Sequence, residues 1–201
     1  EMNALLATRG MTQGSIGARM LALAKDPANQ FADTDAGREA LLDYVRAKVK
    51  GAETRYADLL PASLIPRQSL LVKRVPVATQ ASAPGGYYDG PSLDGTRPGT
   101  YWINLRDMTA VAKLRLPTLS YHEGVPGHHT QGSIAAALGA VPTLIKIASF
   151  NAYAEGWALY AERLMAELGT YRDDPLGDLG RLQDELSPAV RLVVPNATHY
   201  Q

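Results

Sequence analysis

Residues 122–129 read His-Glu-Gly-Val-Pro-Gly-His-His and hold three of the four histidines in this 201-residue chain. A helix turns by about 100° per residue, so His122 and His128, six residues apart, would not share a face of a regular helix. Proline removes a backbone donor, and glycine accepts unusual dihedral angles. We therefore expect Pro126 and Gly127 to bulge or break the helix, which would bring both histidines to one side.

The spacing of these histidines is close to a known metal-binding pattern. In the motif H-E-x-x-H, two imidazoles lie one turn apart on a helix, and the glutamate beside the first one acts as a base. Removing two residues here restores that spacing, which favours His122 and His128 as ligands and Glu123 as the base. His129 is the alternative second ligand, because it returns to nearly the same face as His122, about 10 Å along the helix. The structural alternative is a surface turn, which the scarcity of histidine elsewhere disfavours.

A third ligand is expected from a neighbouring helix in residues 150–162 (FNAYAEGWALYAE). Glu155 would be costly to bury in this apolar stretch unless it were paired or bound to a metal. Glu162 lies two turns further on and is a weaker candidate, more consistent with a solvated or paired carboxylate. For Glu155 the structural alternative is a buried ion pair between helices. Close helix packing is favoured by the small residues Ala152, Ala154, Gly156 and Ala158.

The composition limits the kinds of partner and of metal site. Twenty basic and twenty acidic residues cancel, so no basic excess indicates nucleic acid or an anionic membrane as a partner. Because the chain has no cysteine, disulfides and thiolate sites are excluded, and a metal must be held by imidazole and carboxylate. We expect Zn²⁺, since two imidazoles and one carboxylate leave an open position, as in catalytic zinc sites. No apolar run is long enough to span a bilayer.

The first half of the chain predicts helices followed by a small β-ribbon. Helical spacing is found in residues 14–25 and 35–60, with Thr34 as the N-cap of the second helix. Residues 70–77 predict an edge strand, because Pro76 cannot donate to a neighbouring strand. Residues 101–105 predict a second strand that could pair with the first and form one wall of a cleft. Residues 83–100 are rich in glycine and proline and are expected to form loops and turns.

The second half predicts three helices, at residues 118–138, 143–168 and 176–186. Gly139 and Gly169 stand where helix C-terminal glycines are common. We find no repeat and no linker, so residues 1–201 are expected to form a single, mainly α domain with a small β-ribbon. The chain begins with Glu1, which is consistent with removal of a leader or an N-terminal region, and we favour a periplasmic or secreted location over a cytoplasmic one.

The histidine stretch resembles the signature His-Glu-x-x-Pro-Gly-His-His of the bacterial family known as domain of unknown function 885. The resemblance implies a zincin-like helical metallopeptidase domain related to gluzincin carboxypeptidases, as the C-terminal part of a longer protein. After Val194 the family pattern continues Asp-Thr-Gly-x-His, whereas residues 195–199 here keep only His199 in register. Further matches lie at Tyr87-Tyr88, Arg97-Pro98-Gly99, Asn104-Leu105, Gln131, Glu155-Gly156-Trp157-Ala158-Leu159-Tyr160 and Arg191-Leu192-Val193-Val194.

The expected chemistry is zinc-dependent hydrolysis of a peptide or a small amide. Zinc would lower the pKa of a bound water towards about 7, and Glu123 would accept its proton and pass it to the leaving amine. An oxyanion donor is expected among Tyr153, His199 and Tyr200. Arg191 or Arg97 could bind a substrate carboxylate, although a structural salt bridge is the alternative for each.

Two other functions remain open from the sequence. One is a zinc hydrolase that acts on a non-peptide amide or ester, and the other is a non-catalytic domain that inherited the fold. Tyr88 and Asn104 are further candidates for lining the cleft.

Overall fold

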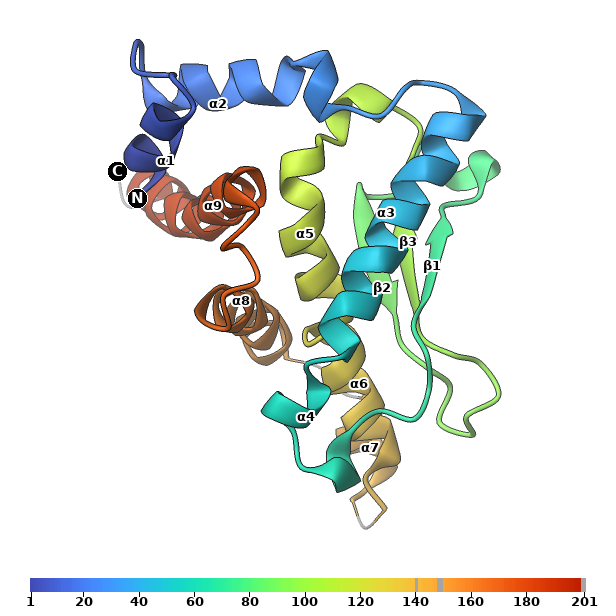
Figure 1. The fold of residues 1–201 in the computed structure, drawn as a ribbon. Helices are drawn as coiled ribbons and strands as arrows, with labels where there is room; N and C mark the ends of the chain where they lie inside the picture. The colour runs from blue at the N-terminus through green and yellow to red at the C-terminus, as the bar shows by residue number, and fades with distance from the viewer. Residues whose placement is uncertain (140, 148–149, 200–201) are drawn as a thin grey trace.

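The computed structural model describes residues 1–139, 141–147 and 150–199, and for residues 191–199 it describes the backbone only. The chain is mainly helical and has one three-stranded sheet (Figure 1). The helices are α1 (Met2–Thr8), α2 (Ile16–Lys25), α3 (Asp35–Glu53), α4 (Tyr56–Leu59), α5 (Leu116–Leu119), α6 (His128–Ala137), α7 (Thr143–Ile147), α8 (Asn151–Glu167) and α9 (Pro175–His199). The strands are β1 (Leu71–Arg74), β2 (Gly86–Asp89) and β3 (Thr100–Ile103). The mainly α class with a small sheet is therefore as predicted.

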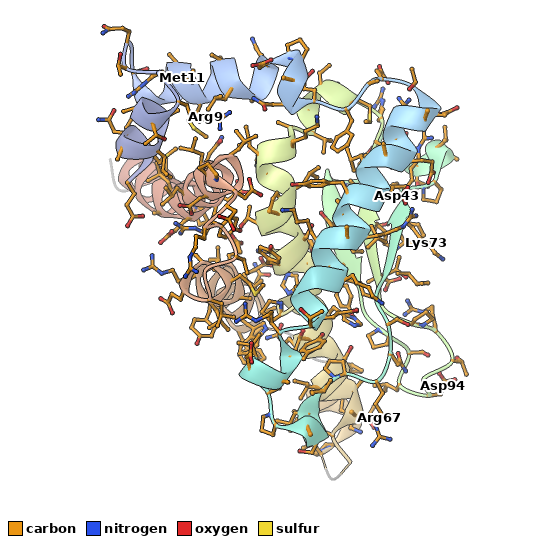
Figure 2. All side chains as sticks on the ribbon, in the orientation of Figure 1. Arg9, Met11, Asp43, Arg67, Lys73 and Asp94 are labelled. Atoms are coloured by element: carbon orange, nitrogen blue, oxygen red, sulfur yellow. The ribbon has the colours of Figure 1, made fainter. Side chains whose placement is uncertain are left out.

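Helix α5 lies at the centre of the molecule, between α3 and the sheet on one side and α8 and α9 on the other (Figure 1). The side chains of α3, α5 and the sheet fill the space between these elements (Figure 2). This main core includes Leu41, Val45, Val49, Tyr101, Leu105, Leu116, Tyr121 and Met165. Helix α5 is short and is packed against other elements on both sides. This packing fixes the position at which the next segment, Ser120–Gly124, begins.

The N-terminal helices α1 and α2 pack near α9 and form a second, smaller core. The Ser15 side chain accepts a hydrogen bond from the Ala18 backbone and caps α2, in agreement with the helix predicted for residues 14–25. Helix α1 was not expected from the sequence. The second core consists of Leu6, Met20, Leu23, Ala112, Leu114 and Leu179.

Helix α3 begins where the sequence predicts. The Thr34 hydroxyl accepts a hydrogen bond from the Gly37 backbone at 3.0 Å, so the predicted N-cap is confirmed. The helix ends at Glu53 rather than near residue 60, and the short helix α4 follows it. The apolar pattern continues through Tyr56 because that side chain also enters the core, although from a separate element.

The sheet has the order β1-β3-β2. Strand β1 pairs with β3 in parallel, with Leu71 opposite Thr100, so the predicted pairing and the predicted edge position of β1 are both observed. Strand β2 pairs with β3 in antiparallel fashion, with Tyr88 opposite Tyr101. The prediction of loops alone for residues 83–100 was wrong, because a four-residue strand between glycines is too short to show an alternating pattern.

The predicted C-terminal helices are present but divided differently. Residues 118–138 are split between α5, a π-helical segment at Ser120–Gly124, and α6. Helices α7 and α8 replace the single helix predicted for residues 143–168, and Phe150 before α8 is extended. Helix α9 continues past residue 186 to His199, and Gly169 after α8 has a φ of +77°. Short 3-10 turns lie at Pro27–Asn29, Ala62–Leu64, Val77–Thr79, Met108–Ala110 and Lys113–Arg115.

Within the described part of the chain, no helix has both the length and the apolar character needed to cross a membrane.

Candidate metal centre

The helix that carries the histidines is interrupted at the predicted place. After the wide π turn at Ser120–Gly124, the chain leaves the helix, and α6 begins at His128 with Gly127 as its N-cap. The Gly127 N–H donates to the Tyr121 carbonyl at 2.9 Å. A Cβ on Gly127 would overlap the carbonyl oxygens of Tyr121 and His122, so this tight break requires glycine.

The break brings two histidines and one glutamate together. His122 Nε2 lies 3.4 Å from one carboxylate oxygen of Glu155, and His128 Nε2 lies 3.7 Å from the other. The three ligand atoms of this group all lie within 4.8 Å of one another. Bonds of about 2.0–2.1 Å in tetrahedral geometry place zinc ligands about 3.4 Å apart. The group therefore needs only a small contraction to hold one such ion.

His122 is held from its other side by Glu162 of α8. The Nδ1–H of His122 donates to Glu162 at 2.7 Å, and the Thr118 hydroxyl donates to the second carboxylate oxygen at 2.7 Å. Glu162 is buried, and a carboxylate only accepts, so the proton of a neutral His122 belongs on Nδ1. The lone pair of Nε2 is then directed at Glu155, which is how a second carboxylate orients a metal-binding histidine.

His129 lies beside the candidate ligands but is fully engaged elsewhere. Its side chain is 1% exposed, and its Nε2 lies 3.1 Å from the Gln68 carbonyl. Its Nδ1 lies 3.1 Å from the Tyr88 hydroxyl. Because the carbonyl only accepts, Nε2 donates and Nδ1 accepts from Tyr88. Burial lowers the pKa of His129, which favours this neutral form. Of the two alternatives left open by the sequence, the geometry therefore selects His128.

The position of His128 is fixed by contacts from β2 and α8. The Tyr88 ring stacks on the His128 imidazole, with ring centroids 6.5 Å apart and planes inclined by 22°. The Trp157 indole N–H donates to the carbonyl oxygens of Pro126 and Gly127, at 3.0 and 3.3 Å. Trp157 lies two residues after Glu155, so α8 both supplies the carboxylate and anchors the break that precedes His128.

The electrostatics of the group favour a cation. Burial lowers the pKa of His122, but the hydrogen bond that His122 donates to Glu162 and the charges of Glu123, Glu162 and Glu155 outweigh burial, so the net shift is upward. The carboxylates that stabilise a proton on His122 would stabilise a metal cation in the same way. Burial lowers the pKa of His128, with His122 adding to the shift. A neutral His128 is the form that binds metal.

Glu123 lies next to His122 in the π segment and is partly buried. Burial raises the pKa of Glu123 to about 7, against the opposing effect of His122. A carboxylate with a pKa near neutrality is suited to accept and release a proton at that pH.

Glu155 differs from the expectation in one respect. Its side chain is 49% exposed, so the argument that its burial requires a metal was wrong. Of the four small residues thought to allow close packing, only Ala158 is buried. The first turns of α8 face solvent, and Glu155 is singled out by its position opposite the two histidines rather than by burial.

The remaining candidate residues lie apart from the triad or outside the described side chains. Tyr153 is 67% exposed on α8, and Arg97 forms a surface ion pair with Asp89 at 2.8 Å, the structural alternative considered above. The Asn104 side-chain amide donates to the carbonyl oxygens of Gln80 and Ala83, so it stabilises the loop before β2. The candidates outside the described residues or side chains are Arg191, His199 and Tyr200.

Comparison with known proteins identifies the family of this chain. The family described as "Bacterial protein of unknown function (DUF885)" matches residues 1–201. The chain belongs to this family. A crystal structure described as "the putative lipoprotein from Colwellia psychrerythraea" is 48% identical and superposes with a TM-score of 0.91. The match covers 96% of this chain but only 33% of that protein, so this family member spans about a third of its relative's length. No curated protein matches the chain.

Sequence reasoning missed several residues that shape the centre. Glu162 is not one of them, because a paired carboxylate was the role favoured for it, and it pairs with His122. Thr118 and Trp157 gave no such signal, because their contacts join segments 30 to 44 residues apart. The role of Tyr88 depends on β2, which was not predicted.

Proposed function

We propose that this DUF885 domain carries the catalytic centre of a zinc-dependent hydrolase of peptide bonds, related to the zincin-like gluzincin carboxypeptidases. The supporting observation is the convergence of His122 Nε2 and His128 Nε2 on the Glu155 carboxylate, with Glu123 beside them. A zinc ion bound there supplies a Lewis acid and makes a water molecule acidic enough to act as a nucleophile near pH 7.

The protein groups have separate roles in this proposal. His122, His128 and Glu155 hold the ion, and the buried Glu162 keeps His122 in the tautomer that binds metal. Glu123 accepts a proton from water and delivers it to the leaving amine, for which a pKa of about 7 is suitable. The half-exposed Glu155 marks the side from which a substrate reaches the centre.

The position of β2 supports a peptide as the substrate. Strand β2 is at one edge of the sheet as far as the structure describes it, and it contacts the π segment that carries His122 and Glu123. The Tyr88 backbone lies close enough to the Glu123 carboxylate to lower its pKa slightly, against the larger effect of burial. An exposed strand edge can bind an extended peptide through main-chain hydrogen bonds. A peptide bound along β2 would therefore pass Glu123.

The description of the relative as a lipoprotein supports a location outside the cytoplasm for this chain as well, which is part of the proposal.

Replacement of Glu123 by Gln tests the proposal most directly. We expect the variant to keep its zinc and to lose about 10²- to 10⁴-fold in hydrolysis, because the amide cannot accept the proton. The measurements are zinc content by elemental analysis and the cleavage of a panel of peptides, amides and esters. Activity of the unmodified protein should disappear with a chelator and return with zinc.

Glu167→Gln is the matched control, because Glu167 is an exposed carboxylate on α8 that pairs with Arg163. Full activity in Glu123→Gln would exclude Glu123 as the base. Bound zinc without turnover of any substrate in the panel would favour a non-catalytic domain, and turnover of esters alone would favour the non-peptide hydrolase.

A further inference from the structure

A cavity of about 410 Å³ lies between the start of β2, the connection that follows β3, and α5. Its lining includes Gly86, Tyr101, Leu116 and Leu119. Leu119 is four residues before Glu123, and Gly86 is two residues before Tyr88, whose ring stacks on His128. The cavity is therefore bounded by parts of the same two segments that reach the candidate metal centre. Its residues come shortly before Glu123 in one segment and shortly before Tyr88 in the other.

The inner surface of the cavity is mostly apolar, with one hydroxyl. Leu116 is fully buried, and Tyr101 is 1% exposed. Among the described residues, the Tyr101 hydroxyl has no hydrogen-bond partner, although the side chain lines the cavity. Burial raises the pKa of Tyr101, and the charge of Glu123 adds to the rise, so the hydroxyl stays protonated and can donate. A donor that faces a cavity and makes no hydrogen bond within the protein can donate to an acceptor on a ligand.

The charged residues of the lining do not select an ionic ligand. The guanidinium of Arg115 is already bound to Asp184, at 2.9 Å. Arg106 and Asp107 both line the cavity, and their charges are opposite. With Asp184 counted against Arg115, these charges cancel, and none is left to attract a charged side chain. A volume of about 410 Å³ is at the lower end of the range for ligand pockets, and it suits a single residue rather than a longer segment.

We propose that this cavity binds one side chain of the substrate, next to the bond that is cleaved, and that it takes a large uncharged side chain, with tyrosine preferred. This inference rests on the proposed peptide hydrolysis. Val111 and Leu119, the partly exposed aliphatic residues of the lining, contact the apolar part of the side chain, and the Tyr101 hydroxyl donates to a polar tip. Peptides with glycine or a charged residue at that position bind less well.

Methyl NMR of the metal-free protein can test the cavity separately from catalysis. The probes are blocked tripeptides that differ only in the central residue, which is Gly, Glu, Leu, Phe or Tyr. We expect the Leu, Phe and Tyr peptides to shift the methyl signals of Val111, Leu116 and Leu119. The Gly and Glu peptides should bind at least about tenfold more weakly, because they bury no large apolar side chain.

Two variants make the test specific. Tyr101→Phe removes only the hydroxyl, so it should weaken the Tyr peptide about 3- to 10-fold and leave the Phe peptide unchanged. Gly86→Val should weaken the Leu, Phe and Tyr peptides, because a Cβ at Gly86 lies 3.4 Å from the Tyr101 ring and 3.7 Å from its hydroxyl. Both expectations concern binding alone and need no zinc.

Another cavity provides the control. It has a volume of about 450 Å³ and lies between the loops that carry Arg67 and Asp94, near α6 (Figure 2). Leu64→Trp fills that cavity and should leave peptide binding unchanged. Shifts at Leu64, Leu93 and Ile134 instead of Val111, Leu116 and Leu119 would overturn the proposal. Equal binding of all five peptides, or no shift up to about 10 mM peptide, would overturn it as well.

Failure of the proposed function has a different signature. A protein that binds the Tyr peptide in this cavity but holds no zinc, or holds zinc without cleaving peptides, would contradict the hydrolase and leave the cavity as a peptide-binding site. Zinc-dependent cleavage at the same rate for every residue next to the cleaved bond would support the hydrolase and contradict the cavity as the binding site of that residue.

Discussion

His128 and His129 are adjacent in the sequence, yet they have opposite environments. His128 is partly exposed and presents Nε2 to Glu155 at 3.7 Å. His129 is buried and uses both ring nitrogens, towards Gln68 and Tyr88. Neighbouring residues on a helix point about 100° apart, so one side chain faces Glu155 and the other faces the protein interior. The difference shows that residue type alone does not distinguish a candidate metal ligand from a structural histidine, whereas the contacts of the ring nitrogens do.

His128→Ala should have the largest effect, and that effect should be on metal binding. Loss of a direct ligand should reduce zinc affinity by more than the 10- to 100-fold that is typical for an outer partner. Competition with a zinc chelator measures this affinity. The free energy of unfolding of the metal-free protein should change little, because His128 is not part of the buried core. Retention of normal zinc affinity would show that another residue is the second ligand.

His129→Ala should act on stability instead. The substitution opens a cavity and removes the hydrogen bonds of His129 with the Tyr88 hydroxyl and the Gln68 carbonyl, so we expect a loss of about 2–4 kcal/mol in the free energy of unfolding. Urea denaturation of the metal-free protein gives this value without a contribution from zinc. At low temperature the folded variant should still bind zinc. A large loss of zinc affinity in a folded variant would contradict the assignment of His129 as structural.

Tyr88→Phe should have the smallest effect, and it separates the two roles of Tyr88. The phenyl ring can still stack on His128, whereas the hydrogen bond to His129 is lost, which should cost about 0.5–1.5 kcal/mol in the free energy of unfolding. Zinc affinity should be unchanged. Tyr87→Phe is the matched control, because Tyr87 is the preceding residue of β2 and stacks on Trp102 instead. An equal loss of stability in both variants would show that the His129 contact contributes nothing specific.

Local sequence patterns predicted part of the fold. The cap of α3 at Thr34, the helix α2 and the edge position of β1 each depend on a few neighbouring residues. Local patterns did not predict where the C-terminal helices are divided, and they did not predict strand β2. Both features depend on packing against distant segments. Glu155 is an instructive case, since the prediction placed it with the histidines for a reason, burial, that the structure does not support.

The sequence by itself determined the donors that could hold a metal and the point at which the helix must break. With no cysteine and only four histidines, few ligand sets were possible, and Pro126-Gly127 could not continue a regular helix. Only the tertiary structure decided which histidine faces Glu155, which carboxylate orients His122, and which residues line the cavity beside α5. These outcomes depend on contacts between α5, α6, α8 and β2, and local sequence does not encode how separate elements are packed together.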